Sequence, residues 1–190
     1  MYGGEVTLTG AVSNLTARNA ATADAWEIAG VKRVLNLLTV RFPPAFAVPS
    51  DETIEDSVQV TLSCHPDVYS EAIDVSVTGG VVTLEGTVNA YWKRWKAENL
   101  VSDLSGVRDI ENRLTVVPTE SRLDQQVAEE IEAALVRNLH IDPDRVTVKV
   151  ENGRVRLTGS VETYYGRARA YEAAANTAGV IEIDNDVVVV

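Results

Sequence analysis

The sequence predicts an α+β protein built from tandem repeats of a helix–strand–strand–helix–strand unit. Each unit is expected to form a small mixed three-stranded sheet with two helices on one face. Two observations lead to this fold class. A signature of glycine and apolar residues recurs three times along the 190 residues, and within the repeat the apolar period changes from about four residues to two. The first repeat lacks the leading helix and strand, so it is predicted to be truncated.

The repeat is defined by two signatures at fixed spacing. Segments 4–12, 80–88 and 153–161 share the pattern G-x-V-x-L-x-G-x-V. Each is followed, at the same distance in all three copies, by a Gly-Val pair and then by an asparagine. These later residues are Gly30 and Asn36, Gly106 and Asn112, and Gly179 and Asn185. Such self-similarity at a fixed period is typical of a repeated structural unit.

The first element of a complete repeat is an amphipathic helix. In the third copy, expected over 123–139, apolar residues recur every fourth position at Val127, Ile131, Leu135 and Leu139, which is helical spacing. The second copy has an equivalent helix over 51–63. Its Asp51, like Ser121 of the third copy, is a candidate N-cap. Residues 1–3, which precede the signature of the first copy, are too few to supply this helix.

A hairpin, a second helix and a last strand complete the repeat. Strands over 73–77 and 146–150 alternate apolar and polar residues and lead into Gly79-Gly80 and Asn152-Gly153, dipeptides that favour tight hairpin turns. Helices follow over about 89–104 and 162–177, and strands over 110–116 and 181–189 end the units.

Two linkers divide the chain, namely segment 41–50 and a shorter segment around 117–121. Segment 41–50 contains three prolines and is not expected to form a regular element. The predicted organisation is a partial strand–helix–strand repeat over 1–40, this linker, and complete repeats over 51–117 and 121–190. Units this small are marginally stable alone, so we expect the repeats to pack on one another. Upstream sequence or another chain would have to complete the first repeat.

The composition excludes several classes of protein. The net charge is −11, which argues against nucleic acid as a partner. No apolar run approaches the roughly 18 residues of a membrane-spanning helix. With one cysteine and two histidines, neither a disulfide framework nor a metal site is expected. Cys64-His65 lacks further ligands and a third group to orient a nucleophile–base pair.

The repeated motifs closely resemble the BON domain, a bacterial module named for osmotically inducible and nodulation proteins. The resemblance rests on the G-x-V-x-L-x-G-x-V strand, the distal G-V-x-x-[VI]-x-N segment and the element order, and it covers nearly the whole chain. It implies a non-enzymatic module without cofactors that binds phospholipid or the cell envelope in osmotic stress. It favours the bacterial envelope or periplasm. No signal peptide is evident in this chain, so the cytoplasm stays open.

One surface feature is not explained by the fold. At about 100° per residue, the core stripe of the helix over 89–104 carries Ala97 and Val101, and Trp92 and Trp95 fall on the opposite side. Tryptophan favours membrane–water interfaces, and basic residues favour anionic headgroups. The candidate lipid or partner surface comprises Tyr91, Trp92, Lys93, Arg94, Trp95 and Lys96, with a weaker version at Tyr164, Tyr165 and Arg167.

An alternative interpretation stays open. Exposed aromatic residues on small tandem domains also pack between repeats or between protomers. Trp26 falls off the core side of its helix, which favours such contacts. The alternative function is therefore a structural interaction protein whose repeats mediate oligomerisation or binding of a protein partner. Net charges of +1 for residues 1–49, −8 for 50–120 and −4 for 121–190 restrict lipid binding to a local basic cluster.

Overall fold

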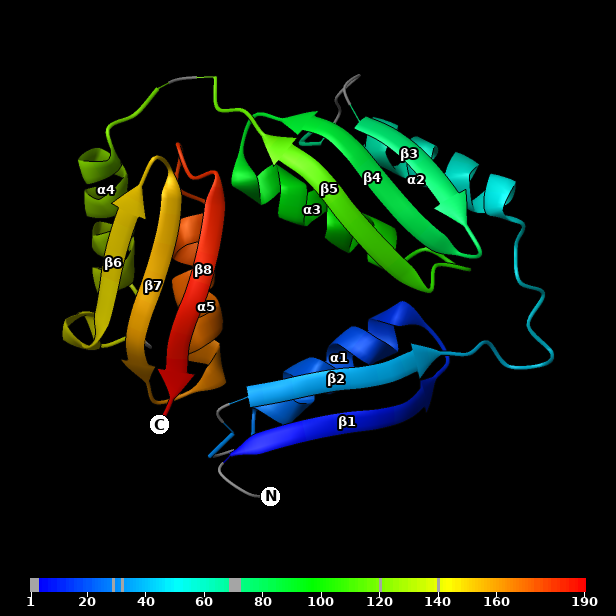
Figure 1. Cartoon of the computed structure of the whole chain (residues 1–190), viewed down its shortest axis with the longest axis horizontal. Coiled ribbons are helices and arrows are strands. Elements are labelled where there is room, and N and C mark those ends of the chain that lie inside the picture. The colour runs from blue at the N-terminus through cyan, green and yellow to red at the C-terminus, as the bar shows by residue number, and fades with distance from the viewer. Residues whose placement is uncertain (1–3, 29, 32, 69–72, 120, 140) are drawn as a thin grey trace.

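The structure is a computed structural model that describes residues 4–28, 30–31, 33–68, 73–119, 121–139 and 141–190. Three units follow one another along the chain (Figure 1). Unit 1 consists of β1 (Glu5–Val12), α1 (Leu15–Trp26) and β2 (Arg33–Val40). Unit 2 consists of α2 (Asp51–Cys64), β3 (Ile73–Thr78), β4 (Val81–Val88), α3 (Tyr91–Ser102) and β5 (Asp109–Val116). Unit 3 consists of α4 (Asp124–Val136), a 3₁₀ turn (Pro143–Arg145), β6 (Val146–Glu151), β7 (Arg154–Val161), α5 (Tyr164–Ala175) and β8 (Glu182–Val189).

Units 2 and 3 have the predicted mixed sheet. The central strands β4 and β7 pair antiparallel with β3 and β6, and parallel with β5 and β8. In unit 1 the described strands β1 and β2 pair in parallel, in the same register as β4 with β5. The predicted α+β fold class of repeated units is confirmed.

Each complete unit has its own apolar core between the sheet and its two helices. In unit 2, Ile54 and Val58 of α2 meet Leu84 of β4 and Val101 of α3. In unit 3 the predicted stripe of Val127, Ile131 and Leu135 is buried.

Two details of the first helices differ from the sequence prediction. Leu139 is 98% exposed, because α4 ends at Val136 and Ile141 takes its place in the core. The N-cap of α2 is Ser50 rather than Asp51, and that of α4 is Leu123 rather than Ser121.

Asp51 and Asp124 instead hold the hairpin turns. The Asp51 carboxylate accepts hydrogen bonds from the amides of Gly79 and Gly80 at 2.7 and 2.9 Å. Asp124 accepts equivalent bonds from the amides of Asn152 and Gly153 at 2.6 and 2.9 Å. The first helical residue of each complete unit therefore ties α2 or α4 to the turn between the first two strands.

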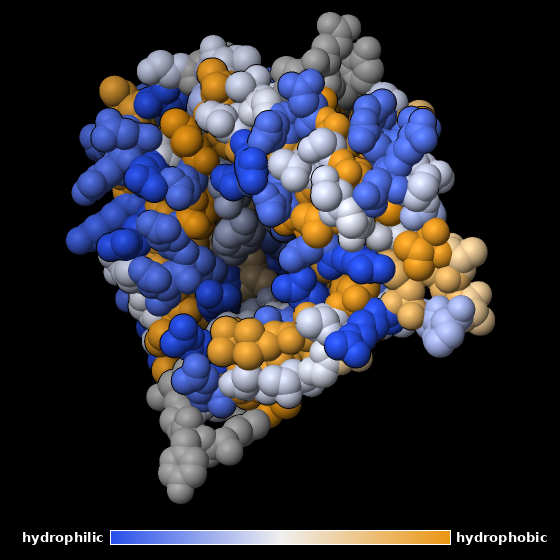
Figure 2. Space-filling view, turned by 45° about the vertical axis from the view of Figure 1, so that its right-hand side comes forward, coloured by the Kyte–Doolittle hydropathy of each residue, from blue (hydrophilic) through white to orange (hydrophobic). Residues whose placement is uncertain are grey.

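The three units surround a common centre (Figure 1). The second helices α1, α3 and α5 lie on the inner side of their sheets, and α2 and α4 lie further out. Figure 2 shows a hollow in the middle of the molecule, bordered by both hydrophilic and hydrophobic residues. The second helices, where the sequence predicts a functional surface, are therefore also the elements through which the units meet.

Candidate functional site

The starts of the second helices make the contacts between units. Leu15, Tyr91 and Tyr164 are the first residues of α1, α3 and α5, and they occupy equivalent positions of the repeat. Leu15 belongs to the core of unit 2, Tyr91 contacts unit 3, and Tyr164 contacts unit 1. The three contacts run in one direction, from unit 1 to unit 2, from unit 2 to unit 3 and from unit 3 to unit 1, and so close a ring.

The contact from unit 1 to unit 2 is polar around an apolar centre. Leu15 is buried, and beside it the Thr16 hydroxyl donates to the Ser102 carbonyl oxygen at 3.3 Å. Arg18 forms an ion pair with Asp109 at 3.1 Å. Exposed ion pairs contribute little to stability, so the buried leucine is the main stabilising part of this contact.

The contact from unit 2 to unit 3 joins two tyrosines. The hydroxyls of Tyr91 and Tyr171 lie 3.0 Å apart, and the rings meet edge to face with centroids 6.3 Å apart. Burial, and then the hydrogen bond with Tyr91, raise the pKa of Tyr171 well above its usual value. The environment of this contact therefore favours the neutral form of Tyr171.

The contact from unit 3 to unit 1 is an aromatic and cationic stack. The rings of Tyr164 and Trp26 stack at 5.4 Å with an interplanar angle of 10°. The guanidinium of Arg167 lies 4.9 Å from the centre of the Trp26 ring. Such contacts are favourable beyond the area they bury. Trp26 thus makes the contact between repeats that its position off the core side of the helix predicts.

The repeated asparagine connects each second helix to the last strand of its unit. The side-chain amides of Asn36, Asn112 and Asn185 donate to backbone carbonyl oxygens of the second helices. Their side-chain oxygens accept from the backbone amide two residues further along the strand. Sequence analysis identified this asparagine only as a marker of the repeat. Its structural role explains why the same residue stands there in all three copies.

The predicted surface on α3 divides into two groups. Tyr91 is used between units, and Arg94 donates to the Asn112 carbonyl oxygen at 3.2 Å. Trp95 is 43% exposed. The other members of this surface, namely Trp92, Lys93 and Lys96, are half-buried, and the Lys93 ammonium lies 5.6 Å from the centre of the Trp92 ring. We call Trp92, Lys93, Trp95 and Lys96 the α3 patch.

The weaker predicted surface on α5 is largely engaged within the molecule. Tyr164 stacks on Trp26. Arg167 donates to the carbonyl oxygens of Val187 and Asn185 at 2.9 and 3.1 Å, and burial lowers its pKa. Tyr165 remains exposed, with the Arg169 guanidinium 4.7 Å from its ring centre. The α5 equivalents therefore contribute less free aromatic and basic surface than the α3 patch.

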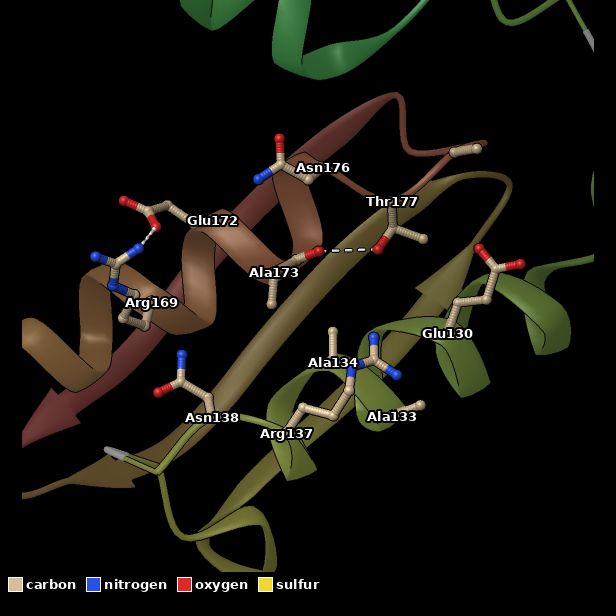
Figure 3. Close-up of a pocket in the computed structure, with 11 residues that line it drawn as sticks. Glu130, Ala133, Ala134, Arg137, Asn138, Arg169, Glu172, Ala173, Asn176 and Thr177 are labelled. Atoms are coloured by element: carbon tan, nitrogen blue, oxygen red, sulfur yellow. Dashed lines mark hydrogen bonds and ion pairs between the residues drawn. The ribbon is translucent and has the colours of Figure 1, made fainter.

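A groove of about 610 Å³ lies between α4 and α5 (Figure 3). Alanines of both helices form its floor, and the ion pair of Arg169 with Glu172 at 2.6 Å lies on one side.

Cys64 and His65 lie elsewhere, at the end of α2, where Cys64 is exposed and His65 lies 3.8 Å from Asp67. Among the residues described, no group of three or more His, Cys, Asp or Glu side chains could hold a metal ion. Nor does any helix in the described ranges have the length and apolar character to cross a membrane.

Fold and surface together define a protein of repeated α+β modules that meet through their second helices. The chain belongs to the BON domain family, whose model matches residues 1–41, 50–118 and 123–190. It is similar to osmotically-inducible protein Y of Escherichia coli (strain K12), with 27% identity over 142 residues that cover 72% of this chain and 71% of that protein.

Two solved structures of CdsD, a structural protein of the type III secretion system of Chlamydia trachomatis, also match. Each has 19% identity and a TM-score of 0.30. The matches cover 98% and 99% of this chain and 81% and 86% of those chains. With so low a TM-score, this similarity carries no argument about function.

Proposed function

We propose that this protein is a non-enzymatic binding module of the bacterial cell envelope that acts in osmotic stress and attaches to anionic phospholipid through the α3 patch. Membership of the BON family and the similarity to an osmotically-inducible protein support the setting. The observation that supports the α3 patch as the binding surface is the exposure of Trp95. This aromatic residue is 43% exposed and lies next to two lysines and a second tryptophan. In this proposal the complete repeats 51–117 and 121–190 and the partial repeat 1–40 are the domains of the module.

The physical basis is the pairing of aromatic and basic groups. Tryptophan side chains favour the headgroup region of a bilayer, and lysines near the surface contribute about 1 kcal/mol each toward anionic lipid. The net charge of −11 opposes approach to such a membrane, but charges beyond about 8 Å are screened at physiological salt. Binding through a local patch is therefore compatible with an acidic protein and depends on ionic strength.

Vesicle co-sedimentation tests the proposal. The protein is expected to bind vesicles containing phosphatidylglycerol more strongly than phosphatidylcholine vesicles, with weaker binding at higher salt and a blue shift of tryptophan emission. Replacing Trp92 and Trp95 together by alanine is expected to weaken the binding strongly. Trp26→Phe, which keeps an aromatic ring between units, is the matched control. Equal binding by the double variant and the control would contradict the proposal.

A second candidate function is self-association through the outer face of unit 1. Leu35 and Leu37 are 39% and 54% exposed there, where β5 carries Glu111 and Arg113 at the equivalent positions. Residues 1–49 have a net charge of +1, against −8 for 50–120 and −4 for 121–190, so repulsion between like charges opposes self-association least at unit 1. The combined variant Leu35→Glu with Leu37→Arg is expected to convert a dimer to a monomer by light scattering. A monomeric wild-type chain would exclude this function.

A further inference from the structure

The linker between units 1 and 2 carries an exposed non-polar segment, residues 42–49, which we call the linker loop. Its sequence is FPPAFAVP, without a charged or hydrogen-bonding side chain. All residues from Pro43 to Val48 are exposed, and Phe46 and Val48 are 38% and 45% exposed. Figure 1 shows the chain between β2 and α2 running outward at the edge of the molecule, away from the centre where the units meet. Contiguous exposed apolar surface marks a site of interaction.

The linker loop is held in place by contacts within itself and with unit 2. The rings of Phe42 and Phe46 stack with centroids 5.2 Å apart. The guanidinium of Arg108 lies 5.4 Å from the centre of the Phe42 ring. At the other end of the loop, a Cβ at Gly106 would lie only 3.1 Å from the Cδ atom of Pro49. Because the exposed side chains are already positioned, their binding to a partner costs less conformational entropy.

The backbone of the linker loop is suited to a medium without water. Unpaired amides oppose burial in lipid, because the hydrocarbon offers them no hydrogen-bond partner. Pro43, Pro44 and Pro49 have no amide N–H, and the amide of Phe46 donates to the Pro43 carbonyl oxygen at 2.9 Å. At least half of the loop positions therefore present no free donor. Interfaces between proteins contain many direct hydrogen bonds, which the side chains of this loop cannot make, so lipid is the better match.

Basic side chains lie beside the loop. Arg41 precedes it and Arg108 contacts Phe42, and both arginines are exposed. Neither guanidinium forms an ion pair with another described residue. Of the acidic residues that follow the loop, Glu52 is exposed, and the Asp51 carboxylate is bound to the amides of the turn between β3 and β4. Basic residues near a membrane surface favour anionic headgroups, so the two arginines complement the apolar loop.

We propose that the linker loop inserts into the interfacial region of an anionic phospholipid bilayer. Phe46 and Val48 enter between the acyl chains, and Arg41 and Arg108 face the headgroups. Attachment of this kind strengthens with the apolar area that it buries. The inference rests on the proposed attachment to phospholipid and adds an inserted segment to the α3 patch. The patch acts through tryptophan and lysine side chains, whereas the loop acts through uncharged side chains, so the two contributions can be measured separately.

A fluorescent label on the loop tests the insertion. In the full chain the exposed Cys64 is replaced by serine, and Ala47→Cys is labelled with the environment-sensitive dye NBD. On addition of phosphatidylglycerol vesicles, the NBD emission is expected to rise and to shift to the blue, and lipids with brominated acyl chains should quench it. The same label at Ser76→Cys, an exposed position of β3, is the control and should not respond.

Two variants with the same change of charge provide a second test. Val48→Asp places a carboxylate in the loop, and Val60→Asp places one on α2, at a valine that is 60% exposed. Since both variants have the same net charge, a difference between them reports the position of the carboxylate. Val48→Asp should weaken binding to phosphatidylglycerol vesicles by about tenfold or more, and Val60→Asp much less. Circular dichroism checks that both variants keep the fold.

The outcomes separate this inference from the proposed function. Co-sedimentation of the labelled chain without a change of NBD emission would overturn the insertion and leave attachment through the α3 patch in place. Equal binding by Val48→Asp and Val60→Asp would do the same. Absence of co-sedimentation by the wild-type chain would overturn both. A blue shift that appears without vesicles and grows with protein concentration would also overturn the insertion, because a second copy of the chain would then cover the loop.

Discussion

Tyr171 shows how a single side chain couples the units to pH. Its hydroxyl lies 3.0 Å from that of Tyr91 across the contact between units 2 and 3. Burial and this hydrogen bond favour the neutral phenol, so its pKa is raised in the folded protein. The resulting stabilisation is fully present below the unfolded pKa of about 10. It is lost as the pH rises above 10 toward the folded pKa.

We therefore expect one of the six tyrosines to ionise after the exposed ones in an absorbance titration of the phenolate band. The variant Tyr171→Phe should remove that late step and lower the free energy of unfolding at pH 7 by about 1 kcal/mol. Tyr165→Phe, which changes an exposed ring on the same helix, should leave the late step in place. A late step that persists in Tyr171→Phe would show that another tyrosine is the buried one.

At the scale of single elements, β7 and β1 differ in what lies beside them. Gly159→Ala should destabilise the protein strongly, because its Cβ would overlap the Arg145 carbonyl. Gly10→Ala carries a similar backbone strain at positive φ, but its Cβ would meet only a Leu38 methyl group at 3.8 Å. The difference between the two variants isolates the steric effect of the neighbouring strand. We expect it to exceed about 2 kcal/mol in denaturant unfolding, and equal losses would contradict this assignment of the two environments.

Sequence periodicity predicted the order and type of the elements well, because the same glycine and valine positions recur in each copy. It failed where a helix ends. The four-residue spacing continues from Leu135 to Leu139, but the chain turns after Val136, and Ile141 enters the core instead. It also failed at Asp51, because a carboxylate that looks like an N-cap reaches the hairpin amides only in the folded unit.

The candidate surface was predictable only in part, because contacts between units do not follow from the pattern of a single helix. A helical projection separates Trp92 and Trp95 from Ala97 and Val101, and the structure has the latter pair in the core. No projection of one helix can tell that Tyr91 meets another unit, because that depends on how the repeats are arranged. The three equivalent helix starts differ in sequence, and each is matched to a different neighbour.

At the scale of the whole molecule, the contact of Trp26 with Tyr164 closes the ring between the first and last units. The two linkers already hold unit 1 to unit 2 and unit 2 to unit 3, so this contact is the one that depends entirely on noncovalent packing. Loss of either aromatic side chain should therefore separate unit 1 from unit 3 without unfolding units 2 and 3, because each of these units has its own buried cluster.

Trp26→Ala and Tyr164→Ala should each give an increased radius of gyration in small-angle X-ray scattering. Their double-mutant cycle should give a coupling free energy of about 0.5–1.5 kcal/mol. Trp95→Ala, which removes a tryptophan from the α3 patch, should change neither quantity. An unchanged radius in both ring variants would mean that the contacts of Leu15 and Tyr91 alone fix the arrangement of the three units.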